Sequence, residues 1–225
     1  DAVWPAYAAL LASRPGAVVD ALQRPPQTNE VGRTGALVPG MLMVAADTGM
    51  PLRLREIGSS AGLNLRVDRY WFGADGVGWG RADSPVRLTD LWSPGVPPFS
   101  TRAVIADRRG CDRNPIDATS EAAALTLLSY VWPGQDARFV MLRAALDIAR
   151  ETPVTIDRAE ASSWAEAQLD QPVPGMATII YHSVVWQYLD GQTRTRVADA
   201  IEAAGARATS EAPVAWLRLE PEPET

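Results

Sequence analysis

From residue 52 onward the sequence alternates short apolar runs with helix-like stretches, and this alternation restricts the fold more than any other feature. Helices are expected at 120–130, at 136–150 and at 193–204, where Gly205 would close the last one. Strands alternating with helices form a mostly parallel sheet that carries helices on both faces. We therefore expect an α/β fold with a doubly wound sheet, whose strands lie near residues 52–57, 102–106, 154–156, 177–181 and 214–219.

Two further segments complete the expected domain organisation. Residues 1–50 form a helical segment, broken at Pro15-Gly16, that we expect to pack on the core made by residues 51–225. The insertion at 68–100 is rich in aromatic residues and glycine, and predicts a β-hairpin turning at 74–78. Such an insertion is more often a cap or a substrate wall than core. The start at Asp1 and the abrupt end suggest one structural unit truncated at both ends.

Composition excludes several classes of function. The chain has 225 residues and a net charge of -6, so duplex nucleic acid is a poor partner. All 21 basic residues are arginine, which removes a lysine Schiff base and a P-loop lysine. One cysteine, Cys111, and one histidine, His182, exclude cysteine-cluster and multi-histidine metal sites, and we expect no metal. The lone thiol suits a reducing cytoplasm. No apolar run reaches the ~18 residues of a membrane span.

The turn after the first strand carries the most informative motif, Glu56-x-Gly58-x-Ser60-x-Gly62. In a doubly wound sheet, ligands bind beyond the carboxyl ends of the strands, where the strand order reverses. Gly58 permits a sharp turn, Ser60 is small enough for a ligand to approach, and Gly62 permits close packing of the next helix. The motif resembles the first motif of class I S-adenosylmethionine-dependent methyltransferases, whereas the dinucleotide fingerprint fails because residue 63 is leucine.

That resemblance implies further cofactor contacts at later strand ends. Glu56 would orient the network around the methionine end of the cofactor. An acid after the second strand would bind the ribose: Asp112 resembles it, and Asp107 is the alternative. Glu160 and Ala161 would approach the adenine, and 181–189 would lie between the sulfur and the substrate.

Nearly the whole chain is also similar to an uncharacterised bacterial family, domain-of-unknown-function family 2332. The similarity rests on residues 27–33, 56–65, 109–115 and 182–188. It implies a methyltransferase-like fold and supplies no substrate. The acidic charge and the aromatic insertion favour a small-molecule substrate over nucleic acid. The oligomeric state stays open.

Two residues are candidate catalytic bases. His182 ends an apolar strand, and an imidazole titrates near neutral pH, so it is the first candidate, although a lone histidine is as often structural. Glu30 is the second candidate. The substrate pocket is expected to include Asn29, Arg33, Asn64 and Trp186, although Asn29, Glu30 and Arg33 could equally cap a helix. We expect His182, Trp186 and the 29–33 segment to converge beneath the aromatic hairpin.

The sequence therefore predicts a methyltransferase that uses S-adenosylmethionine. A non-catalytic module that binds this cofactor or a nucleoside is the alternative, because its motifs would be identical. A nucleotide enzyme using Asp112 and Glu160 with Mg²⁺ is a third possibility.

Overall fold

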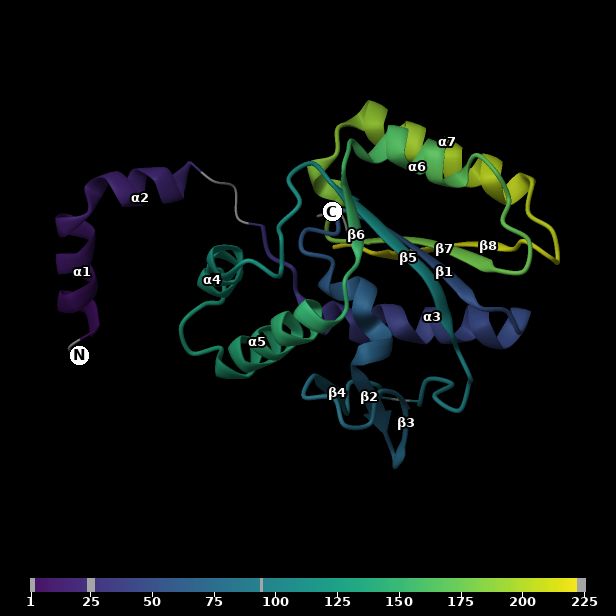
Figure 1. Ribbon diagram of the computed structural model, residues 1–225, viewed down its shortest axis with the longest axis horizontal. Helices are drawn as coiled ribbons and strands as arrows, with labels where there is room; N and C mark the ends of the chain where they lie inside the picture. The colour runs from purple at the N-terminus through teal and green to yellow at the C-terminus, as the bar shows by residue number, and fades with distance from the viewer. Residues whose placement is uncertain (1–2, 24–26, 94, 222–225) are drawn as a thin grey trace.

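The main sheet has five parallel strands: β1 (Leu52–Ile57), β5 (Ile105–Asp112), β6 (Thr155–Arg158), β7 (Ala177–Ser183) and β8 (Val214–Leu219). The computed structural model describes residues 3–23, 27–93 and 95–221. Across the sheet the strands run β6-β5-β1-β7-β8 (Figure 1). The chain therefore builds outward from β1 to β6, and then crosses back to place β7 on the other side of β1. The strand order reverses between β1 and β7.

Helices cover both faces of the sheet, as the alternation predicted. Helices α6 (Ala161–Leu169) and α7 (Gly191–Ala206) cover one face, and α3 (Thr34–Thr48) and α5 (Asp136–Glu151) lie on the other (Figure 1). Helix α4 (Glu121–Ser129) precedes α5, and two 3-10 helices, η1 (Val31–Arg33) and η2 (Leu63–Arg69), flank α3 and β1 along the chain. Buried side chains form one apolar cluster on each face, because successive residues of a strand point to opposite sides.

The aromatic insertion forms a small three-stranded sheet of order β3-β2-β4. Strands β2 (Trp71–Ala74) and β3 (Val77–Gly80) make the predicted hairpin, and β4 (Arg87–Thr89) pairs with β2 in parallel. The small sheet lies beyond α3, on the side away from α6 and α7 (Figure 1). The Trp92 indole donates a hydrogen bond of 2.9 Å to the carbonyl of Gly35 in α3. The insertion thus extends the core below α3.

The N-terminal segment divides into two parts. Helix α3 packs on the sheet and buries seven residues. Helices α1 (Val3–Ser13) and α2 (Pro15–Leu22) meet at the predicted break, but neither buries a residue, and both lie apart from the body of the molecule (Figure 1). Of these three helices, only α3 contributes buried residues.

Two expected boundaries were wrong for physical reasons. Strand β5 covers 105–112 rather than 102–106, because its charged residues are paired: Arg108 with Asp68 at 2.6 Å and Arg109 with Asp157 at 2.6 Å. Charged side chains can lie within a sheet when they are paired, so a strand that contains them cannot be recognised from hydropathy alone. Helix α7 continues through Gly205 to Ala206, because that glycine keeps a helical conformation.

The join between β5 and the turn after β1 leaves no room for a side chain at Gly110. A Cβ there would lie 2.7 Å from the Cβ of Ser59. We predict that Gly110→Ala lowers the free energy of unfolding by about 1–3 kcal/mol, measured by urea denaturation. Gly205→Ala is the control, because a Cβ at that helical position meets nothing within 4 Å; it should raise stability by up to ~1 kcal/mol. Equal stability of Gly110→Ala and the unsubstituted protein would contradict this packing.

Candidate functional site

The candidate site is the crevice at the carboxyl ends of the strands, beside the reversal of strand order. Ile57 of β1 pairs with His182 of β7, and Cys111 of β5 pairs with Ile57 on the other side. The three strands therefore end together, and the turns that follow them meet at one edge. In parallel α/β sheets this edge is where ligands bind.

The turn of residues 58–62 is held in an unusual backbone conformation. Gly58, Ser60 and Gly62 all have positive φ angles, of 70°, 52° and 67°. A Cβ at Gly58 would lie 2.5 Å from Cγ2 of Val185 in the turn after β7. Ser60 tolerates the left-handed region because its amide donates to Asp112 at 2.9 Å. Strained, over-determined turns of this kind concentrate at functional sites.

Within the part of the chain that the structure describes, three buried polar atoms beside this turn have no hydrogen-bond partner: Glu56 Oε2, Ser60 Oγ and Asn64 Oδ1. Glu56 is the last residue but one of β1 and is almost completely buried. Burial raises the pKa of Glu56 to about 8, against the opposing effects of Asn64 and the Arg33 guanidinium. A buried carboxyl oxygen without a partner costs free energy, so Oε2 of Glu56 needs a functional explanation.

Asp112, the last residue of β5, is the acid at the crevice. Its carboxylate accepts hydrogen bonds from the Ser60 amide at 2.9 Å, the Asn114 amide at 2.8 Å and the Gln27 side chain at 3.0 Å. The alternative acid, Asp107, lies near the start of the strand and pairs with Arg55 at 2.5 Å. The structure therefore brings Asp112, and not Asp107, to the turn after β1.

Residues 27–33, which we call the strap, run across the mouth of the crevice. At one end Gln27 reaches Asp112, and Asn29 Oδ1 accepts from the Leu63 amide at 2.8 Å. At the other end Arg33 donates to the Ser183 carbonyl at 2.9 Å. Gln27, Asn29 and Arg33 thus join the end of β5, the start of η2 and the end of β7. Glu30 instead forms an ion pair with Arg138 of α5.

His182 lies at the end of β7 but faces away from Glu56. Its partner in the register, Ile57, precedes Gly58, so His182 is close to the turn along the sheet. Strand alternation nevertheless directs it to the α6–α7 side, where its fully buried ring stacks on Trp186 with centroids 4.9 Å apart. The expected convergence beneath the aromatic hairpin is therefore wrong for His182 and Trp186, because the small sheet lies on the opposite side of the main sheet.

Glu220, which follows β8, is a site residue that the sequence did not reveal. Its carboxylate lies 2.5 Å from Nδ1 of His182 and accepts from the amides of Val185 and Trp186, both at 3.2 Å. Burial would raise the pKa of Glu220, but these hydrogen bonds outweigh burial and hold its pKa below the usual range. The acidic, proline-rich residues 220–224 suggested only a solvated linker; of these, 222–224 lie outside the described residues.

The turn held by Glu220 also contains a strained residue. Val184 has a φ of 52°, which is rare for a β-branched side chain. Glu220 accepts hydrogen bonds from the amides of Val185 and Trp186, which follow Val184. Val185 in turn packs directly against Gly58. The position of this turn therefore depends on a carboxylate from the neighbouring strand.

Glu160 and Ala161 lie at the end of β6, where Ala161 begins α6. The Glu160 carboxylate caps this helix by accepting from the amides of Ser162 and Ser163. Burial would raise the pKa of Glu160, but these hydrogen bonds outweigh it and lower the pKa. The Ala159 amide donates to the Asp112 carbonyl at 3.0 Å, so the ends of β5 and β6 are also joined.

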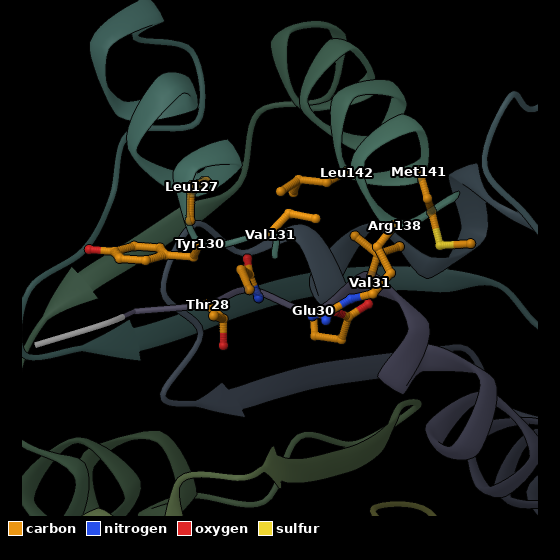
Figure 2. A pocket seen from close by; sticks show the side chains of 10 residues that line it. Thr28, Glu30, Val31, Leu127, Tyr130, Val131, Arg138, Met141 and Leu142 are labelled. Atoms are coloured by element: carbon orange, nitrogen blue, oxygen red, sulfur yellow. The ribbon is translucent and has the colours of Figure 1, made fainter. Parts of the chain in front are cut away.

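A separate hollow lies between the strap and helices α4 and α5 (Figure 2). Its walls include Leu127, Tyr130, Val131, Met141 and Leu142, and the Glu30–Arg138 ion pair lies on one side. The hollow is open to solvent.

Over residues 3–23, 27–93 and 95–221, no three histidine, cysteine, aspartate or glutamate side chains gather where they could hold a metal ion. Among the helices of those same ranges, none combines the length and the apolar character needed to span a bilayer.

Comparison with known proteins identifies a family but no better characterised relative. The model of one family, described as an uncharacterized protein conserved in bacteria (DUF2332), matches residues 1–225. Neither the curated proteins nor the solved structures provide a match.

Glu56 should make stability depend on pH. Its pKa is raised from 4.5 in the unfolded chain to about 8 in the folded protein. The folded state then binds the proton more tightly, so stability falls as pH rises from about 4.5 to 8. We predict that Glu56→Gln removes a loss on the order of a few kcal/mol between pH 5 and pH 8, measured by urea denaturation. Parallel pH profiles for the two proteins would contradict the raised pKa.

Glu220 should control the mobility of the turn after β7. Loss of a hydrogen bond to a charged acceptor costs about 1.5–3 kcal/mol, so Glu220→Ala should speed hydrogen exchange at the Val185 and Trp186 amides by roughly tenfold or more. Glu202→Ala, at an exposed position of α7, is the matched control and should leave both amides unchanged. Unchanged protection in Glu220→Ala would show that the carboxylate does not hold the turn.

Proposed function

We propose that this chain, which belongs to the DUF2332 family, binds S-adenosylmethionine in the crevice, within a Rossmann-like fold of the class I methyltransferase type. One observation carries the proposal. The small-residue turn after β1 and the acid at the end of β5 lie together, with the Ser60 amide bound to Asp112. They meet beside the reversal of strand order, which is where this architecture binds ligands.

The polar atoms beside the turn fit the polar groups of this cofactor. Glu56 Oε2 and Asn64 Oδ1 are buried acceptors without donors, and Ser60 Oγ can donate or accept. An ammonium group such as that of the methionine moiety would supply the missing donors and stabilise Glu56 as a carboxylate. Buried polar atoms without partners cost free energy, and a ligand that pairs them recovers it.

Asp112 is the residue proposed to hold the ribose hydroxyls. A carboxylate has about four lone-pair sites, and three donors already use three of those on Asp112. The Gln27 side chain is the one donor that comes from the strap, so ribose binding would replace Gln27 and leave the two backbone amides in place. Glu160 and Ala161 are proposed for the adenine end; because Glu160 already caps α6, Ala161 and the neighbouring backbone are the freer groups there.

We propose methyl transfer to a small molecule as the reaction. When bound, S-adenosylmethionine supplies a methyl group activated by its sulfonium, so the protein has to supply alignment, exclusion of water and in some cases a base. Asn29 and Arg33 of the strap, Asn64, and the Val184–Trp186 turn would enclose the reacting end.

The non-catalytic alternative has a specific observation in its favour. His182 is fully buried and its Nδ1 is bonded to Glu220, while Glu30 is paired with Arg138. In this conformation His182 is buried against Trp186, on the side of the sheet away from Glu56, and Glu30 is paired with Arg138, so neither candidate base faces a substrate in the crevice. A module of the same fold that binds the cofactor without turnover would need neither residue. Release of S-adenosylhomocysteine with candidate substrates separates the two functions.

Calorimetric titration with S-adenosylhomocysteine tests the cofactor site. We predict that the unsubstituted chain binds it and that Asp112→Asn weakens binding by roughly tenfold or more, because loss of a charged acceptor costs about 1.5–3 kcal/mol. Gly58→Val should abolish binding, because its side chain would collide with Val185 and its φ of 70° disfavours a β-branched residue.

Asp117→Asn is the matched control, since Asp117 is exposed and follows the same strand. Thermal unfolding of each variant separates lost binding from lost folding. Absence of binding by the unsubstituted chain, or equal affinities for Asp112→Asn and Asp117→Asn, would refute the site.

A further inference from the structure

His182 lies on the side of the sheet away from Glu56, yet it contacts the turn that packs against Gly58. Its imidazole is fully buried and stacks on Trp186, and Trp216 of β8 packs against the same ring with centroids 5.9 Å apart. Its Nδ1 atom lies 2.5 Å from Oε1 of Glu220. The ring therefore meets the turn after β7 in two ways, through its face and through Nδ1.

The imidazole proton lies on Nδ1. A carboxylate can only accept, so Nδ1 has to donate to Glu220. The other ring nitrogen, Nε2, is buried and has no hydrogen-bond partner among the described residues, so no group there competes for the proton. Burial would raise the pKa of Glu220, and the hydrogen bond from His182 is the foremost of the effects that outweigh burial and lower it. His182 therefore does more than either backbone amide to keep Glu220 ionised.

Glu220 depends on His182 for its connection to the sheet. Its Oε1 atom accepts from Nδ1 of His182 and from the Val185 amide, and its Oε2 atom accepts from the Trp186 amide. Two of these three donors belong to the turn that the carboxylate holds. Among the described residues, His182 is thus the donor that ties the Glu220 carboxylate to a strand.

We propose that His182 is a positioning residue, which acts through Glu220 to hold the turn after β7 against Gly58. Val184 in this turn has a φ of 52°, which is unfavourable for a β-branched residue and has to be maintained by the contacts around it. With the carboxylate in place, Val185 packs on Gly58 so closely that even a Cβ atom there would collide with it. In the crevice this contact would set the wall beside the reacting end, a role that rests on the proposed function.

Two substitutions separate the hydrogen bond of His182 from its packing. His182→Phe keeps a ring against Trp186 and removes the donor, whereas His182→Asn removes the ring and keeps an N–H donor at the same distance along the side chain. We expect hydrogen exchange at the Val185 and Trp186 amides to be roughly fivefold faster or more in His182→Phe, and to change by less than about twofold in His182→Asn. The reverse order, or equal acceleration in both variants, would overturn the proposal.

A double substitution tests whether His182 acts through Glu220. If it does, His182→Phe adds nothing to the exchange rates of Glu220→Ala, because the acceptor is already absent. Additive acceleration would overturn the proposal. The Val184 amide, which donates to the Leu219 carbonyl at 2.9 Å, is the internal reference and should exchange at an unchanged rate. Equal acceleration at Val184 would indicate general loosening of the strand ends and would also overturn it.

Thermal unfolding midpoints show whether each variant is folded. If His182→Phe does not fold, His182→Asn still decides, because faster exchange in that variant contradicts the proposal.

Calorimetric titration with S-adenosylhomocysteine separates this role from the proposed function. His182→Phe should weaken binding roughly threefold or more, whereas His182→Asn should bind as the unsubstituted chain does. Equal affinities for His182→Phe and the unsubstituted chain would overturn the link between the turn and the crevice. Absence of binding by the unsubstituted chain would refute the cofactor site instead, and the exchange rates, which need no ligand, would then decide the role of His182.

Discussion

The close approach of backbone segments around residues 58–62 is the constraint on which the rest of the site depends. This turn touches β6 through Gly62, β5 through Ser59 and the turn after β7 through Gly58. At each contact a side chain would take space that another element occupies. The three strand ends can therefore meet only because the residues at these contacts have small side chains or none. The carboxylate of Asp112 then joins β5 to the turn by accepting a hydrogen bond from the Ser60 amide.

Much of the fold follows from patterns that are local in sequence. Strand β7 is an unbroken apolar run because both of its faces are covered, and the turn after β1 is marked by its small residues. The bounds of strand β5 were predicted wrongly because its charged residues pair with residues far away in sequence, such as Asp68 and Asp157. A local pattern contains no information about such partners, so a buried charged strand resembles an exposed loop.

The candidate site was predictable to the same extent and for the same reason. Asp112 could be found through the resemblance of the acid in residues 109–115 to the ribose-binding acid of the methyltransferases. Glu220 could not be found, because its role depends on lying beside the end of β7. The side to which His182 points depends on strand register, which determines whether a residue faces one layer or the other. A motif can thus indicate which residues come near the crevice without indicating which of them face it.

The absence of lysine has a consequence for how the sheet responds to its surroundings. Its interior cations are arginines, and even Arg53, whose pKa burial lowers to about 10, with Arg55 beside it adding to the shift, stays charged in any physiological medium. The ion pairs that join β1 and β5 therefore cannot be undone by alkali within that range. Only protonation of the aspartates can break these ion pairs, so the electrostatic attraction between the two strands weakens at low pH and not at high pH.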